Sequence, residues 1–140
     1  MKTFGSDRIK EEVILVARFL LVLLFLIFGW GKLTDYSGTV AYMQQVGAPM
    51  PPIATIIAIF MEVFVCSAIL VGIFTRPLAV LLAIYTLGTA LIGHHYWTMT
   101  GMAHFEGKIN FYKNISIIGG CFLLYVTGAG KYSLDNKLGL

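Results

Sequence analysis

Two ionisable side chains interrupt apolar stretches of the chain, and they are the first candidates for chemistry. Arg18 lies within the apolar run 13–31, and Glu62 lies near the middle of the run 52–74. Each run is long enough to cross a bilayer as a helix. Exposing either charge to lipid would be costly, so both side chains should face protein or water. We predict that Arg18 and Glu62 form a buried polar pair.

The sequence leaves three interpretations of this pair open. Depth along the two helices places the residues about 10 Å apart along the membrane normal, a gap that a long Arg side chain largely spans. The pair could be structural, or Arg18 could extend alone to the membrane interface. In the functional interpretation the two residues bind a head group or move a proton. Glu62 would then bind the proton, because Arg stays charged.

A second group of polar side chains is predicted at the opposite ends of the apolar runs, close to one membrane interface. This outer-face cluster consists of Lys32, His94, His95, Lys113 and Asn114. Ammonium, imidazole and amide groups can donate hydrogen bonds to the carbonyl oxygens of a quinone or to a lipid head group. The alternative is that these residues only anchor the helices at the interface or cap them.

The histidines do not indicate a metal or haem site. His94 and His95 are adjacent, so on a helix they point about 100° apart. With His104 and Glu106 they match no closed zinc pattern. All the histidines lie in one short segment, whereas axial haem ligands would have to face each other from separate helices. We therefore predict no metal and no haem.

The composition indicates an integral membrane protein with one domain. Of the 140 residues, 58% are hydrophobic and only 12% are charged, which is about half the charge of a soluble domain. The net charge of +3 comes from basic residues near the ends of the apolar runs, and no basic stripe suitable for nucleic acid is present. Cys66 and Cys121 each lie in an apolar run, where we interpret them as apolar fillers; a redox pair is the alternative.

Four apolar segments predict four membrane-spanning helices, at 13–31, 52–74, 77–95 and 111–128. Residues 75–76 form a turn so short that the second and third helices must be neighbours. In the first connection, the spacing of Val40, Met43 and Val46 predicts a short interfacial helix, with an ordinary loop as the alternative. The predicted fold is all-α: an up-down four-helix membrane bundle with this interfacial helix in its first loop.

The lysines and arginines predict the orientation of the chain. Six of them lie near the N-terminus, in the short turn or near the C-terminus, and three lie on the other side of the predicted bundle. By the positive-inside rule, both termini are expected in the cytoplasm.

Glycine and polar positions recur in a characteristic order in the segments 17–33, 61–95 and 110–138. They include a closing Gly-x-Gly-x-x-Ser-Leu-Asp segment, from Gly128 to Asp135, and the earlier positions Arg18, Gly29, Lys32, Glu62, Gly72, Thr75 and Arg76. In this order the chain resembles the DoxX family of small bacterial membrane proteins over nearly its whole length. The resemblance implies a single domain over residues 1–140, located in the bacterial inner membrane.

The resemblance also suggests a function. The family is named for a subunit of an archaeal thiosulfate:quinone oxidoreductase, and other members are linked to oxidative-stress and thiol-redox complexes. The resemblance favours a quinone-interacting subunit that is at most a non-autonomous part of an oxidoreductase. The expected partners in the lipid bilayer are a redox subunit or further copies of the chain in a homo-oligomer. No flavin, haem or iron–sulfur ligand set is visible, so a partner would supply the electrons. The alternatives are a non-catalytic scaffold and a small proton-coupled transporter, in which Glu62 would act within the membrane.

Overall fold

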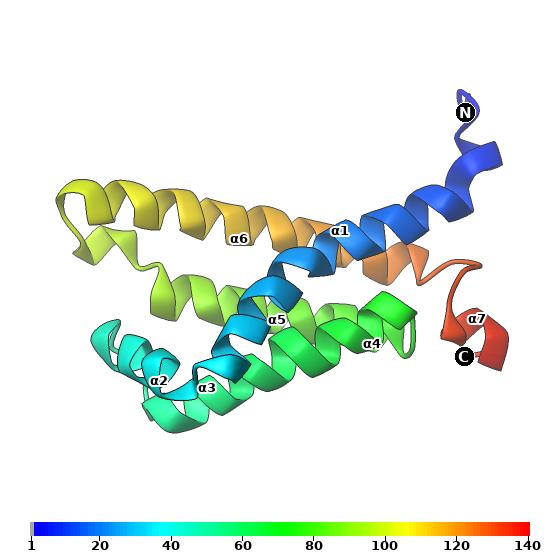
Figure 1. Ribbon diagram of the computed structural model, residues 1–140. Coiled ribbons are helices and arrows are strands. Elements are labelled where there is room, and N and C mark those ends of the chain that lie inside the picture. Colours follow the sequence, from blue (N-terminus) through cyan, green and yellow to red (C-terminus); the bar gives the residue numbers. More distant parts are fainter. Residues whose placement is uncertain (1) are drawn as a thin grey trace.

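The computed structural model describes residues 2–140, in which the regular secondary structure is all helical and no strand is present (Figure 1). The elements in chain order are α1 (Ser6–Thr34), α2 (Tyr36–Gln45), α3 (Pro51–Ile59), the π-helix η1 (Phe60–Val65), α4 (Cys66–Val71), α5 (Thr75–Gly93), the 3₁₀-helix η2 (Tyr96–Thr98), α6 (Gly101–Thr127) and α7 (Leu134–Leu138). Four helical stretches are long and apolar enough to cross a membrane: Ser6–Thr34, Pro51–Val71, Thr75–Thr98 and Gly101–Thr127. The second of these is α3, η1 and α4 joined without a break.

The helices pack mainly in two groups. In one group α1 contacts α3, η1 and α4; in the other, α6 lies along α5 (Figure 1). The apolar core between them includes Val22, Ile69 and Leu82. Cys66 and Cys121 are free thiols with no exposed surface in the same core, where they fill apolar space. Large apolar side chains on the outer faces of the helices remain exposed, as a lipid-facing surface requires.

Several helix boundaries differ from those predicted by hydropathy; α1, for example, begins at Ser6 rather than at residue 13. The second apolar run ends at Val71 rather than Phe74, because Gly72 adopts a left-handed φ of 78° that terminates α4. The last long helix begins at Gly101 rather than Phe111. Its polar first turns are held against η2, where His104 Nδ1 is 2.9 Å from the carbonyl oxygen of Tyr96. Hydropathy detects only the apolar part of such a helix.

A short helix, α2, is present in the first connection. It begins at Tyr36, and the side chain of Asp35 accepts a hydrogen bond of 3.2 Å from the N–H of Gly38. Asp35 is the N-cap residue of α2, because its carboxylate reaches a first-turn N–H group.

The C-terminal strap, residues 128–138, folds back over the end of the bundle where the chain begins (Figure 1). Arg18 on α1 holds it in place. The guanidinium donates to the carbonyl oxygens of Ala129 and Tyr132, the latter at 2.7 Å, and to that of Leu70 on α4 at 3.2 Å. Only 2% of the surface of Arg18 is exposed. One buried cation therefore joins α1, α4 and the strap.

Asp135 in the strap caps the start of α5. Its carboxylate accepts hydrogen bonds from the backbone N–H groups of Phe74, at 2.7 Å, and Thr75, at 2.9 Å. Phe74 occupies the N-cap position and provides no side-chain acceptor of its own. The N–H of Asp135 in turn donates to the carbonyl oxygen of Gly72 at 2.7 Å. A residue distant in sequence thus supplies the cap that α5 lacks locally.

Docking of the strap is expected to weaken in acid. Burial alone would raise the pKa of Asp135, but the hydrogen bonds from Thr75 and Phe74 and the charge of Arg18 outweigh burial and hold this pKa below its ordinary value. The stabilising contribution is therefore complete above a pH of about 4 and is lost as the pH falls through the lowered pKa. Hydrogen exchange of the Phe74 and Thr75 amides, corrected for intrinsic rates, should accelerate in that range. In Asp135→Asn this pH dependence should disappear; pH-independent protection in the wild type would contradict the assignment.

Candidate functional site

Glu62 lies on η1, where α1 packs closely against the second membrane-spanning stretch. A Cβ placed on Gly29 of α1 would lie 2.6 Å from the Cβ of Glu62 and 3.0 Å from its backbone carbonyl carbon. Glycine is therefore needed for α1 to pack this closely. Glu62 is 7% exposed and sits in a π-helical turn, a wide turn that is frequent at functional sites.

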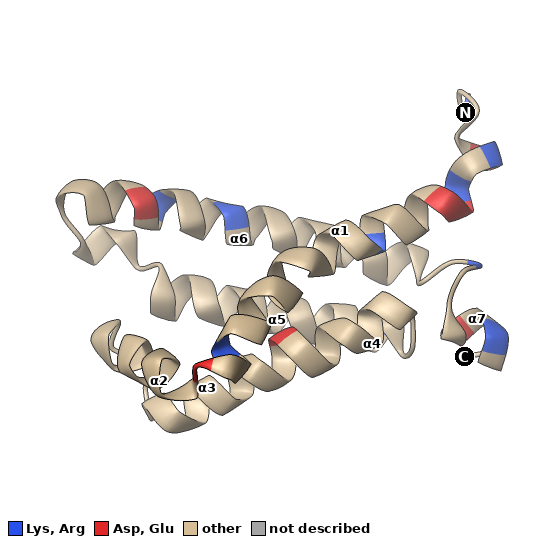
Figure 2. Ribbon diagram, in the orientation of Figure 1, with Lys and Arg blue, Asp and Glu red and all other residues tan. Residues whose placement is uncertain are grey.

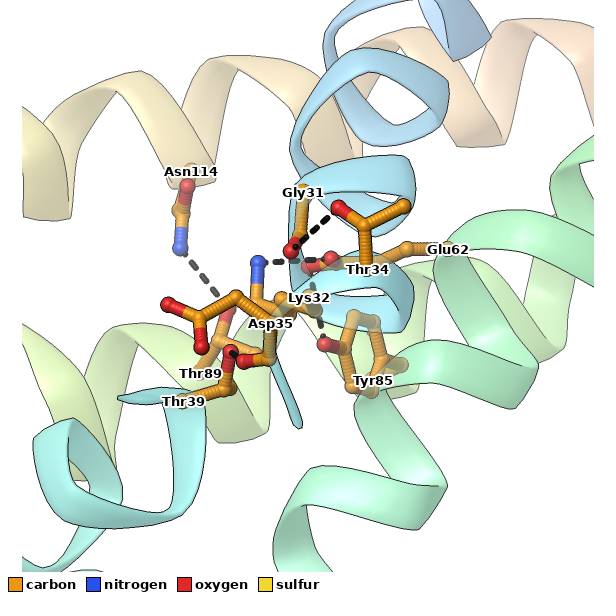
Figure 3. Close-up of polar contacts among 9 residues, drawn as sticks. All are labelled: Gly31, Lys32, Thr34, Asp35, Thr39, Glu62, Tyr85, Thr89 and Asn114. Carbon is orange, nitrogen blue, oxygen red and sulfur yellow. Dashed lines mark hydrogen bonds and ion pairs between the residues drawn. The ribbon is translucent and has the colours of Figure 1, made fainter. Parts of the chain in front are cut away.

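Lys32 on α1 and Tyr85 on α5 meet Glu62 on η1, and we call these three residues the intramembrane polar site (Figure 3). The ammonium of Lys32 on α1 lies 2.7 Å from Oε2 of Glu62, and the hydroxyl of Tyr85 on α5 donates to Oε1 at 3.0 Å. The side chains of Lys32 and Glu62 are 22% and 9% exposed, respectively. Both carboxylate oxygens are thus engaged, one by a cation and one by a neutral donor.

Asn114 on α6 hydrogen-bonds to Thr89 of α5 (Figure 3). Its Nδ2 donates to the hydroxyl of Thr89 at 2.9 Å and to the carbonyl oxygen of Thr86 at 3.4 Å. Asn114 therefore joins α6 to α5 about one helical turn along α5 from Tyr85. Polar side chains from all four membrane-spanning stretches gather in this region.

The predicted pair between Arg18 and Glu62 does not form. Both residues are buried, as predicted, but Arg18 bonds to backbone carbonyl oxygens and Glu62 pairs with Lys32. Glu62 packs against Gly29 of α1. Gly29 lies about 16 Å along α1 from Arg18. Depth counting underestimated this separation because it took no account of the offset between the helices.

The outer-face cluster does not converge on one point. Lys32 turns inward to Glu62, and Asn114 bonds to α5. His95 joins η2 to the end of α2, with Nε2 3.2 Å from the carbonyl oxygen of Val46 and Nδ1 2.7 Å from the hydroxyl of Thr98. His94 is partly buried, and Lys113 is exposed on α6. In the described part of the chain, no three metal-ligating side chains come together.

Tyr85 is the member of the site that sequence reasoning missed. Its place beside Glu62 depends on how α5 is rotated against η1, which no local pattern reports. The sequence did contain one indication, the residue type, because the hydroxyl of a buried tyrosine usually has a hydrogen-bond partner.

Comparison with known proteins identifies the family. The DoxX family model matches residues 13–95, more than half of the chain. The chain belongs to the DoxX family. It is similar to two relatives from Escherichia coli (strain K12) over almost their whole lengths. "Inner membrane protein YphA" is 51% identical over 98% of both chains, and "Inner membrane protein YqjF" is 39% identical over 94% of this chain and 95% of the relative. With its four apolar helices, this DoxX protein is a multi-pass inner-membrane protein.

A more distant similarity extends to a eukaryote. The "ER-derived vesicles protein ERV29" of Saccharomyces cerevisiae is 28% identical over 94% of this chain, which spans 36% of that longer protein. No solved structure gave a significant match.

Gly29→Ala is expected to destabilise the protein, and Gly31→Ala is the matched control on the same helix. The new methyl group at position 29 would overlap Glu62, whereas nothing lies within 4 Å of a Cβ at Gly31. Overpacking should cost Gly29→Ala about 1–3 kcal/mol. Gly31→Ala should gain up to about 1 kcal/mol through helix propensity. Detergent-titrated unfolding measures both; similar values for the two variants would show that α1 and η1 are not packed as described.

Proposed function

We propose that this DoxX protein is a quinone-interacting subunit of a membrane redox system and that Lys32, Glu62 and Tyr85 form its quinone site. The observation that carries the proposal is the carboxylate of Glu62, held by an ammonium and a phenol between apolar helices. Ionisable groups inside a membrane protein are rarely placed without a function. The resemblance to a family named for a quinone oxidoreductase subunit supports the same proposal.

The three side chains have complementary roles in this proposal. Lys32 has three N–H donors, of which one is directed at Glu62, so it can also donate to a quinone carbonyl oxygen. Glu62 can hold a proton, and Tyr85 donates to it and fixes its orientation. Reduction of a quinone consumes two electrons and two protons. A partner redox subunit supplies the two electrons. Glu62 passes one proton to the bound carbonyl oxygen and takes a proton back from water, and the other carbonyl oxygen takes its proton from water.

We also propose that the four helices cross the membrane up and down, with both termini in the cytoplasm and α2 at the opposite interface. The start of α1, the α4–α5 turn and the strap share one end of the bundle, and several basic residues gather there (Figure 2). The excess of basic residues at that end supports this orientation. The intramembrane polar site would then lie in the periplasmic half of the membrane.

A scaffold function is the competing candidate, and one observation favours it. Glu62 already has a protein partner on each carboxylate oxygen, so the site could serve only to join α1, η1 and α5. The two proposals differ in what the purified protein retains. A scaffold needs no small molecule at Lys32.

The deciding experiment is mass spectrometry of small molecules retained by protein purified in mild detergent. Wild type should carry quinone in near-stoichiometric amount. Lys32→Met should lower retention about tenfold, the effect of losing one charge-assisted hydrogen bond. The matched control is Lys113→Met, which removes an exposed lysine on α6 and should retain quinone as the wild type does. Bulk lipid alone in every sample, or quinone retained equally by Lys32→Met, would favour the scaffold.

A further inference from the structure

A second polar region lies at the other end of the bundle, remote from the intramembrane polar site. A cavity of about 400 Å³ opens where the strap crosses the start of α5 and the end of α6. Thr75 and Thr127, which bound it, are the first and last residues of two membrane-spanning stretches. The cavity therefore lies at the level of the lipid head groups.

Two glycines of the family-like pattern make this cavity possible. Gly72 has a φ of 78°, and a Cβ there would lie 2.5 Å from the Cβ of Ser133 in the strap. Gly128 has a φ of 70°, and a Cβ there would lie 3.1 Å from Nε of Arg76. Glycine at these positions lets the strap dock and leaves room for the guanidinium. The closing segment thus builds the cavity wall and takes no part in the site around Glu62.

Four charged residues, two acidic and two basic, line the cavity: Glu11, Arg76, Lys131 and Asp135. Asp135 is fully engaged, because both of its oxygens accept backbone N–H groups. Glu11 uses only Oε2, which accepts the N–H of Lys131 at 2.6 Å. Arg76 uses only Nη1, which donates to the carbonyl oxygens of Tyr125 and Val126 at 2.9 and 3.0 Å. Within residues 2–140, Oε1 of Glu11 and the Nε and Nη2 groups of Arg76 make no further hydrogen bond.

We propose that this cavity binds the head group of phosphatidylethanolamine, with its phosphate on Arg76 and its ammonium on Glu11. Glu11 and Arg76 have opposite charges, and each has unused hydrogen-bonding atoms in the same cavity. A zwitterionic head group is complementary to such a pair. A head group with a net negative charge would also meet the two carboxylates, and a quaternary ammonium has no N–H to donate to Glu11. Phe74 and Pro77 also line the cavity, and exposed Phe74 offers an apolar surface to acyl chains. This proposal is independent of the quinone site.

The test is native mass spectrometry of the whole delipidated protein with three lipids of identical acyl chains. Phosphatidylethanolamine should bind about tenfold more tightly than phosphatidylcholine or phosphatidylglycerol, the effect of one charge-assisted hydrogen bond. Glu11→Gln should remove the preference over phosphatidylcholine, because glutamine keeps an acceptor for the Lys131 N–H and loses the charge. The control is Glu12→Gln, a neighbouring carboxylate that does not line the cavity. Soluble O-phosphoethanolamine, tested alongside, should bind far more weakly than the lipid.

Three results would overturn the proposal. They are equal binding of the three lipids, an unchanged preference in Glu11→Gln, and binding of O-phosphoethanolamine as tight as that of the lipid. Thermal unfolding of each variant shows whether it is folded. Arg76→Gln is a secondary test, because Arg76 also binds the carbonyl groups at the end of α6; if it folds, it should bind all three lipids more weakly.

Discussion

Replacing Lys32 with Met is expected to lower the free energy of unfolding by about 3 kcal/mol. After the substitution, Tyr85 is the remaining partner of the Glu62 carboxylate. Glu62 as a residue is only 7% exposed. An unpaired charge is costly in a buried, apolar position. Detergent-titrated unfolding, followed by circular dichroism, measures the loss.

The double variant Lys32→Met/Glu62→Gln shows whether the loss comes from the unpaired charge. It should regain much of the stability, because a neutral amide can still accept a hydrogen bond from Tyr85 and leaves no charge behind. Glu62→Gln alone should cost less than Lys32→Met, since the Lys32 side chain is 22% exposed and can reach water. If the double variant is as unstable as the sum of the two single variants, the charges are not coupled and the ion pair has no energetic role.

Sequence reasoning placed the membrane-embedded polar residues in buried positions but assigned the wrong partner to Glu62. An ionisable residue within an apolar run has to be buried, so Arg18 and Glu62 could be identified as buried without a structure. Their partners depend on the relative shift of neighbouring helices. That shift is set by close contacts at glycines, which have no side chain to keep two segments apart. Gly29 packs against Glu62 in this way, and Gly72 packs against Ser133.

The role of the closing segment, Gly128 to Asp135, could not be predicted from the sequence either. Asp135 and Ser133 could be read as a polar tail, and Ser133 indeed caps α7 through the N–H of Asn136. That Asp135 caps α5 across the fold follows from a long-range contact with Phe74 and Thr75. Periodicity and capping rules describe neighbours in sequence, so they detect the first contact and miss the second.

Arg18→Met is expected to release the strap and to lower the free energy of unfolding by about 3–5 kcal/mol, as the loss of several charge-assisted hydrogen bonds implies. Three carbonyl groups, of Leu70, Ala129 and Tyr132, lose their donor together. Packing of the methionine side chain offsets part of the loss. Trypsin should then cleave after Lys131 faster than in the wild type, and mass spectrometry identifies the product.

Two further variants separate the geometry of Arg18 from its charge. Arg18→Lys keeps the cation but cannot direct donors to three carbonyl oxygens at once, so its strap should be cleaved at an intermediate rate. Arg8→Met removes an exposed arginine from the same helix and should leave cleavage at Lys131 unchanged. Because Asp135 depends on the docked strap to cap α5, loss of the strap should also speed hydrogen exchange at Phe74 and Thr75. Protection of these amides in Arg18→Met at the wild-type level would show that the strap docks without Arg18.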